Sequence, residues 1–219
     1  MAYTLVIANK RCSSWSLRPW LLMKVAGIPF HEETIFLKKQ DTAERIKKYS
    51  HAGRVPILID GHATVWESLA ICEYLAEHHS EKRLWPEDSN ARAHARSVSN
   101  EMHAGFTALR SNCPMNCATS VSNFRPSEEV LVDIERVSEI WREARKQHGK
   151  EGDFLFGGFS IADAMYAPVA SRFKTYGISV DHACRQYMEA ILSLPAMQEW
   201  IRSSQSETER ISAYEITLK

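Results

Sequence analysis

Four side chains with hydroxyl or thiol groups lie close together near the start of the sequence. Cys12, Ser13, Ser14 and Ser16 fall within the stretch NKRCSSWSLRPWL, between an apolar run and a segment with helical spacing. The N-terminus of a helix presents free backbone N–H groups and a positive dipole end, so a hydroxyl group there can help to bind an anion such as a thiolate. The alternative is that Ser13 or Ser14 only caps the helix.

A hydrogen bond from one serine is strong enough to matter for a thiolate. A thiol with a pKa of about 8.5 is only about 3% ionised at pH 7. Lowering that pKa by about two units requires roughly 2.7 kcal/mol of preferential interaction with the anion. A hydrogen bond to a charged group contributes about 1.5 to 3 kcal/mol, and a helix terminus about 0.3 to 2 kcal/mol. One serine at a helix start is therefore sufficient.

Two further residue pairs have the chemistry to hold a peptide-like ligand. In GRVPIL, Pro56 begins a strand, and a cis Val55–Pro56 bond would turn the N–H and C=O groups of Val55 outward, although most X–Pro bonds are trans. In WESLAI, Ser68 is a candidate N-cap and Glu67 a solvated acid. Together, Glu67 and Ser68 would also clamp an amino acid, the carboxylate binding an α-ammonium group and the hydroxyl an α-carboxylate.

Strand and helix signals alternate over the first eighty residues. Strand signals occur at residues 3–8, 34–37, 55–59 and 63–66. Helix signals occur at residues 17–25, 42–49 and from 68 onward. Asp41 and Glu44 form a capping-box pattern, and Asp60-Gly61 is typical of a tight hairpin turn. The order predicts a thioredoxin-like α/β domain with a mixed sheet, in which ligands bind beyond the carboxyl ends of the strands.

The pattern changes after a polar, proline-containing stretch. Strand signals largely vanish, and helical spacing dominates residues 91–111, 127–148, 160–174 and 183–203. Ser160 and Asp163 form a capping box on a buried helix. A core-facing apolar stripe is expected at Leu131, Ile134, Val137, Ile140 and Trp141. The chain is predicted to divide into an α/β domain (1–80), a linker (81–90) and an all-α domain (91–219).

Composition excludes several classes of function. The chain of 219 residues is 44% hydrophobic and 25% charged, with zero net charge and interleaved signs, which argues against a nucleic-acid or membrane-surface role. No run is long enough to span a membrane, and no signal peptide is expected, so a cytoplasmic location follows. Five cysteines, an odd number, suit a reducing compartment, and their spacing predicts no metal site.

Taken together, these motifs resemble the cytosolic glutathione transferase family over essentially the whole chain. The stretches SSWSLR, SHAGRVPILID, ESLAICEYL, LWP and SIADA follow in the family's order and at its intervals. The serine turn is most similar to that of serine-type, zeta-like members, whose motif has the form S-S-C-x-W-R. Ser13 and Ser14 match its two serines and Arg18 its arginine, whereas Trp15 stands at its cysteine.

The resemblance implies that glutathione is the co-substrate and lies in the N-terminal domain. Ser13, with Ser14 beside it, would stabilise the glutathione thiolate. Val55, preceding a cis Pro56, would pair with the cysteinyl backbone. The γ-glutamyl end would be held by the clamp formed by Glu67 and Ser68.

The resemblance also implies a homodimer and a pocket for a small electrophile beside the all-α domain. Met102, Phe106 and Arg110 are the candidate lining residues of that pocket. Three alternatives to conjugation stay open. They are a glutathione-dependent isomerase of the maleylacetoacetate type, which the Trp15 departure puts in doubt, a thiol reductase or peroxidase based on Cys12, and a non-catalytic binding or dimerisation module.

Overall fold

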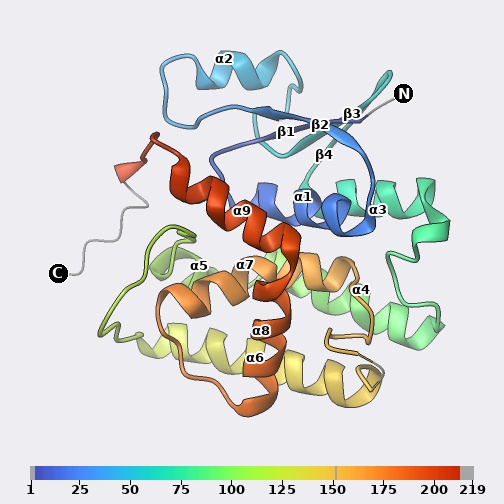
Figure 1. The fold of residues 1–219 in the computed structure, drawn as a ribbon, viewed down its shortest axis with the longest axis vertical. Coiled ribbons are helices and arrows are strands. Elements are labelled where there is room, and N and C mark those ends of the chain that lie inside the picture. The colour runs from blue at the N-terminus through green and yellow to red at the C-terminus, as the bar shows by residue number, and fades with distance from the viewer. Residues whose placement is uncertain (1–2, 151, 213–219) are drawn as a thin grey trace.

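The computed structural model describes residues 3–150 and 152–212, and its N-terminal part contains a four-stranded mixed sheet (Figure 1). The strands are β1 (Tyr3–Ile7), β2 (Phe30–Thr34), β3 (Ile57–Asp60) and β4 (Ala63–Trp66), in the order β2-β1-β3-β4. β1 pairs in parallel with β2 and antiparallel with β3, and β3 and β4 form the predicted hairpin. The thioredoxin-like α/β prediction is confirmed.

Helices cover both faces of this sheet because β1 is apolar on both sides. Leu5 and Ile7 point into the core formed with α1 (Ser14–Ala26) and α3 (Ser68–His78). Val6 points the other way, into a smaller cluster with Ile46 of α2 (Thr42–Lys47). Figure 1 shows α2 on one side of the sheet and α1 and α3 on the other. The continuous apolar run therefore marks a strand buried on both faces.

Two local predictions in this domain are wrong. The second strand occupies residues 30–34 instead of 34–37. Its polar side chains do not look like those of a strand in the sequence, but they find partners in the fold: Glu32 binds Lys10 and accepts a hydrogen bond from Trp20 Nε1 at 2.6 Å. The Asp41–Glu44 capping box does not form, since Asp41 makes no side-chain cap bond. Thr42 Oγ1 instead accepts from Lys39 N and donates to Phe36 O.

The C-terminal part is helical, as predicted. A short 3₁₀ helix, η1 (Ser80–Lys82), follows α3, and the helices beyond it are α4 (Ser89–Ala104), α5 (Thr107–Asn112), α6 (Glu128–His148), α7 (Ile161–Thr175), α8 (His182–Ser193) and α9 (Pro195–Ser206). Figure 1 shows α9 running from this domain back toward the sheet. α4 begins inside the predicted linker, and the domain limits stay a prediction. No helix in the described ranges is long and apolar enough to cross a membrane.

Two predicted helices are each broken in two. The 91–111 helix ends at Gly105, where Phe106 adopts a left-handed φ of 57° before α5 begins. The 183–203 helix is interrupted at Leu194, and Pro195 starts α9.

The predicted stripe on α6 is also wrong at its first position, because Leu131 is 50% exposed and Val130 faces the core instead.

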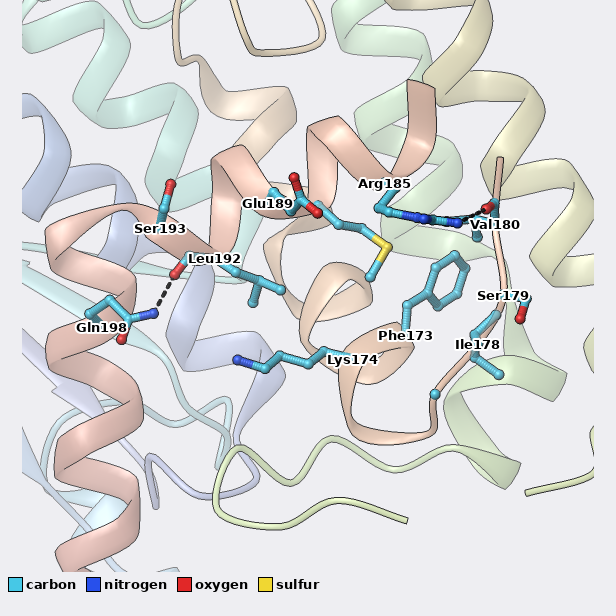
Figure 2. Close-up of a pocket in the computed structure, with 12 residues that line it drawn as sticks. Phe173, Lys174, Ile178, Ser179, Val180, Arg185, Glu189, Leu192, Ser193 and Gln198 are labelled. Atoms are coloured by element: carbon cyan, nitrogen blue, oxygen red, sulfur yellow. Dashed lines mark hydrogen bonds between the residues drawn. The ribbon is translucent and has the colours of Figure 1, made fainter. Parts of the chain in front are cut away.

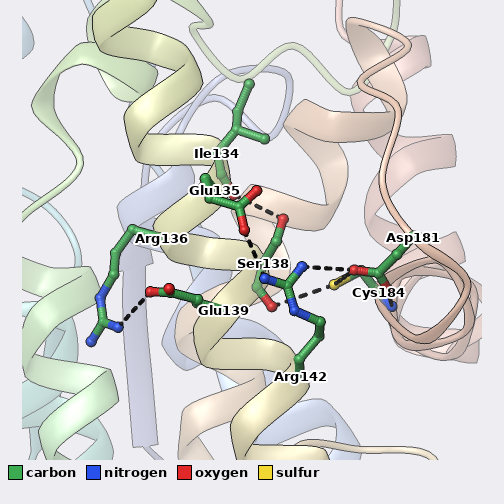
Figure 3. A network of polar contacts seen from close by, with 8 residues as sticks. All are labelled: Ile134, Glu135, Arg136, Ser138, Glu139, Arg142, Asp181 and Cys184. Carbon is green, nitrogen blue, oxygen red and sulfur yellow. Dashed lines mark hydrogen bonds and ion pairs between the residues drawn. The ribbon is translucent and has the colours of Figure 1, made fainter.

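Ion pairs connect the outer faces of α4, α6 and α8. Arg136 of α6 binds Glu101 of α4 at 2.7 Å, and Arg142 bridges Glu135 and Asp181 (Figure 3). Asp181 also caps α8 by accepting a hydrogen bond from Cys184 N. Exposed pairs contribute less than about 1 kcal/mol each, so these contacts mainly fix the relative positions of helices already held by their apolar faces.

The most buried helix, α7, starts at the predicted capping box. Asp163 is fully buried, and its carboxylate accepts from Ser160 N at 2.8 Å, from Ser160 Oγ and from Leu155 N. These bonds satisfy donors that no water can reach. Burial nevertheless raises the pKa of Asp163 to about 6, while the hydrogen bonds act in the opposite direction.

We expect Asp163→Ala to lower the free energy of unfolding by about 2 to 4 kcal/mol, because it leaves two buried N–H groups without acceptors. The pKa of this carboxyl is higher in the fold than in the unfolded chain. Protonation of Asp163 therefore stabilises the folded chain. This contribution is complete below about pH 4 and is lost as the pH rises through about 6. Urea denaturation should therefore show a larger difference from wild type at pH 5 than at pH 7. The exposed Glu143→Ala serves as control, and an equal difference at both pH values would contradict the burial of an ionisable Asp163.

Candidate active site

A cavity of about 850 Å³ lies between the α/β domain and the helical domain. Ser16 of the serine turn is fully buried and absent from its wall, but the other residues that the sequence suggested for the serine turn and the peptide-like ligand line the cavity. Those residues are Cys12, Ser13, Ser14, Val55, Pro56, Glu67 and Ser68. They come from three separate connections, β1–α1, the segment before β3, and β4–α3, so the fold brings together residues up to 56 positions apart.

Ser13 combines both interpretations of the serine turn, because it caps α1 and also borders the cavity. Its Oγ accepts a hydrogen bond from Ser16 N at 3.4 Å and lies 2.8 Å from Ser16 Oγ. Ser16 Oγ in turn accepts from Ala8 N at 3.0 Å, at the end of β1. A backbone amide and two hydroxyl groups therefore form a chain that ends at the cavity wall.

Ser14 contacts a cation that sequence reasoning missed. Arg172 of α7, only 4% exposed, donates to Ser14 Oγ at 3.4 Å and to Cys113 O at 2.8 Å. Burial, and secondarily the nearby charge of Arg110, lowers the pKa of Arg172 to about 10, which leaves the guanidinium charged at neutral pH. The one signal in the sequence is an arginine in the last turn of a mostly apolar helix, which an analysis of apolar stripes does not consider.

Trp15 lies between two more guanidinium groups. The Arg18 guanidinium is 4.2 Å from the Trp15 ring centroid, and that of Arg110 is 4.6 Å from it. Such cation–π contacts contribute about 0.5 to 2 kcal/mol each. Arg18 is buried and donates to Met165 O, and Arg110 donates to two carbonyl groups at the end of α4. Among the described residues, Arg18, Arg110 and Arg172 make no ion pair with a carboxylate. Arg110 and Arg172 line the cavity and Arg18 contacts the wall residue Trp15, so positive charge without a carboxylate partner lies at and beside this wall.

The wall opposite the serine turn provides the backbone and the clamp. The Val55–Pro56 bond is cis, and Val55 precedes the β3 ladder, whose pairs begin at Ile57. Ser68 is not the N-cap that we predicted: Glu67 holds that position, with a left-handed φ of 70° and no side-chain cap bond. The Ser68 side chain is fully buried, and its Oγ has no hydrogen-bond partner in the described part of the chain.

His103 of α4 faces the clamp. Its Nε2 lies 3.8 Å from a carboxylate oxygen of Glu67. Burial, helped by the charges of Arg18 and Arg110, lowers the pKa of His103, although Glu67 acts in the opposite direction. The imidazole is therefore neutral at pH 7, and the Glu67 carboxylate stays available for a cationic ligand group.

One of the three residues expected to line an electrophile pocket borders this cavity. Arg110 borders the cavity, whereas Met102 and Phe106 are buried in the core and are absent from its wall. Both were suggested by the family resemblance, and the helix break at Gly105 lies between them. In the described ranges, no group of three or more histidine, cysteine or acidic side chains is arranged to hold a metal ion.

A second, more open groove of about 620 Å³ lies on the outer face of α7, α8 and α9 (Figure 2). Phe173, Met188 and Leu192 form its apolar floor, and Arg185 at its edge donates to Val180 O. None of the residues that the sequence singled out lies in this groove. The chemistry proposed from the sequence therefore belongs to the cavity between the domains.

The fold and this cavity define a two-domain transferase architecture, and comparisons with known proteins give the family. A family model described as "Glutathione S-transferase, N-terminal domain" matches residues 12–78, and one described as "Glutathione S-transferase, C-terminal domain" matches residues 126–203. The chain belongs to the glutathione transferase family.

Individual relatives support the same family. A probable maleylacetoacetate isomerase of Caenorhabditis elegans is 33% identical over 96 residues, which are 44% of each chain, so the match spans less than half of that relative. Mouse glutathione S-transferase theta-2 is 26% identical over 82% of this chain and 78% of its own. A crystal structure of a glutathione transferase homologue from Burkholderia with bound glutathione superposes with a TM-score of 0.71, at 23% identity, over 94% of this chain and all of that chain.

Proposed function

We propose that this protein binds glutathione in the cavity between its domains and catalyses attack of the glutathione thiolate on a small electrophile. One observation carries the proposal: a hydroxyl-lined helix start, the backbone of Val55 just before the β3 ladder and a carboxylate–hydroxyl pair all border the same cavity. A γ-glutamyl-cysteinyl ligand needs these three contacts together. The family membership and the glutathione-bound structural neighbour support the same ligand.

Glutathione is oriented by groups at the two ends of its γ-glutamyl-cysteinyl part. The Glu67 carboxylate binds the α-ammonium group, and the unpartnered Ser68 hydroxyl binds the α-carboxylate at the N-terminus of α3. The N–H and C=O groups of Val55 pair with the cysteinyl backbone as an added strand edge. This pose directs the thiol toward the start of α1.

Ser13 is the proposed donor to the thiolate. Ser13 Oγ donates to Ser16 Oγ in the structure, and Ser16 Oγ also accepts from Ala8 N. Hydroxyl protons rotate to suit their acceptors, so an anionic sulfur draws the Ser13 proton into the cavity, and Ser16 then donates to Ser13. Arg172 adds positive charge next to Ser14. The thiolate then attacks the electrophilic carbon, and the leaving group departs with the electron pair of the broken bond.

Isomerisation of a maleylacetoacetate-like diacid is the second candidate, and the relatives named maleylacetoacetate isomerase favour it. Trp15 in place of a cysteine argues for conjugation. Quantifying free glutathione separates the two reactions, because conjugation consumes glutathione and isomerisation returns it.

A homodimer and a cytoplasmic location are further proposals from the family, and light scattering on the purified chain tests the first.

We expect Ser13→Ala to reduce kcat with a generic electrophile by about ten- to hundredfold, the equivalent of one hydrogen bond to a charged group. The KM for glutathione should change little. The apparent pKa of the bound thiol, obtained from the pH dependence of kcat/KM for the electrophile at saturating glutathione, should rise by about one to two units. Helix capping is lost as well, so the unfolding free energy should fall by about 1 kcal/mol.

Ser14→Ala is the matched control for the choice of serine. If Ser14→Ala raises the thiol pKa and Ser13→Ala does not, Ser14 is the donor instead. If both variants keep full activity, the serine mechanism is wrong. Mass spectrometry after incubation with oxidised glutathione then tests Cys12, which also borders the cavity.

Glu67→Gln and Ser68→Ala should each raise the KM for glutathione by about tenfold or more and leave kcat within a few fold, because the clamp binds ground state and transition state alike. Titration calorimetry with glutathione should show the same loss of affinity. The substitution Glu77→Gln, on the exposed end of α3, is the control. If the wild-type chain shows no binding at millimolar glutathione, the protein is a non-catalytic binding or dimerisation module.

A further inference from the structure

A carboxylate from the far end of the chain binds the loop that leads into the serine turn. Glu207 follows α9 directly, and its two oxygens accept hydrogen bonds from Lys10 N at 2.5 Å and Arg11 N at 3.0 Å. Successive amides that point at one anion form a small anion-binding concavity. Here the anion is supplied by a residue 196 positions from Arg11 along the chain.

The segment that carries Glu207 is held on both sides. Upstream, Trp200 of α9 packs edge-on against Trp20 of α1, with ring centroids 5.0 Å apart. Downstream, Glu209 makes an ion pair with Lys39, and Ile211 is only 7% exposed. The Glu207 contact is therefore part of a larger packing of residues 200–211 against the α/β domain, which follows from the course of α9 toward the sheet (Figure 1).

The loop at residues 9–12 transmits this contact to Ser13. Asn9 O accepts from Ser13 N at 2.9 Å and from Cys12 N at 3.3 Å, so residues 9 to 13 form one tight turn. Arg11 O accepts from Cys117 N at 2.9 Å, which ties the same turn to the helical domain. Without Glu207, the two amides at the centre of this turn lose their acceptors within the protein, and the turn gains freedom immediately before the serines.

We propose that Glu207 is a positioning residue for the reaction: its carboxylate fixes the 9–12 loop so that the Ser13 hydroxyl faces the sulfur of bound glutathione. Glu207 does not touch the cavity itself. The catalytic part of this inference rests on the proposed function, whereas the structural part, immobilisation of the loop by one carboxylate, does not.

Glu207→Ala is expected to lower kcat by about tenfold or more, since small displacements of a catalytic group cost up to about a hundredfold. The KM for glutathione should stay within about twofold, because the clamp at Glu67 and Ser68 is remote from the loop. The apparent thiol pKa should rise as in Ser13→Ala. Formate, a small carboxylate that can occupy the two amides, should restore activity to Glu207→Ala and leave wild type unchanged.

Two further variants separate positioning from general stability. Glu209→Ala removes the neighbouring ion pair on the same segment and should keep wild-type kcat. Glu207→Gln has the size of glutamate, but it presents an N–H₂ group to one of the two amides. It should therefore resemble Glu207→Ala in kcat without being rescued by formate. If a folded Glu207→Ala keeps its kcat and thiol pKa within twofold of wild type, or if its lost activity shows no formate rescue, the positioning role is overturned.

Hydrogen exchange followed by mass spectrometry tests the loop without reference to activity. The peptide containing residues 9–13 should exchange faster in Glu207→Ala than in wild type, with formate restoring protection, and Glu209→Ala should leave it unchanged. Faster exchange in a chain that shows no glutathione chemistry would refute the proposed function and keep the immobilised loop. Unchanged exchange would refute the immobilisation itself.

Discussion

The burial of α1 between the sheet and α7 is the constraint on which the site depends. Nearly every residue from Ser14 to Met23 is buried, so this helix is apolar around most of its circumference, as expected of a helix packed on all sides. Arg18 donates to Met165 O across the domain boundary. Because α1 belongs to the core of both domains, its N-terminal serines hold a fixed position relative to Arg172 and the α4–α5 wall.

The positive charge beside the cavity follows from that packing. Burial of three arginines whose hydrogen bonds go to carbonyl and hydroxyl groups leaves charge without a carboxylate partner in the described structure. Desolvation by burial, and secondarily repulsion from neighbouring arginines, lowers the pKa values of Arg18 and Arg172 to about 9 and about 10, yet both remain protonated at pH 7. Such an arrangement costs stability, and an anionic ligand would offset the cost. The site is thus preorganised for negative charge before any ligand binds.

Local sequence signals predicted the parts of the site that depend on neighbouring residues. The serine turn, the Asp60-Gly61 hairpin and the Ser160–Asp163 capping box are each encoded within a few positions, and the structure contains all three. The polar strand β2 was misplaced because its carboxylates are satisfied by Lys10, Trp20 and Arg45, partners that only the folded chain supplies.

Contacts between residues far apart in the sequence could not be predicted either, because only the folded chain brings the partners together. Arg172 meets Ser14 across 158 positions and Glu207 meets Arg11 across 196, and neither pairing leaves a periodic signal. Met102 and Phe106, which the family resemblance suggested as lining residues, are buried in the core on the two sides of the helix break at Gly105. The helical spacing over residues 91–111 did not reveal this break, which one glycine followed by a left-handed residue is enough to produce.

Several features that weaken the fold occur together at the cavity. Glu67 holds a left-handed backbone conformation, and the buried Ser68 hydroxyl lacks a partner in the described structure. A strained residue costs about 1 to 3 kcal/mol, and an unsatisfied buried hydroxyl a similar amount. A chain optimised for stability alone would satisfy Ser68 and place glycine at 67. A ligand with an ammonium and a carboxylate group supplies what these two residues lack, and this reciprocity argues that the cavity serves binding more than packing.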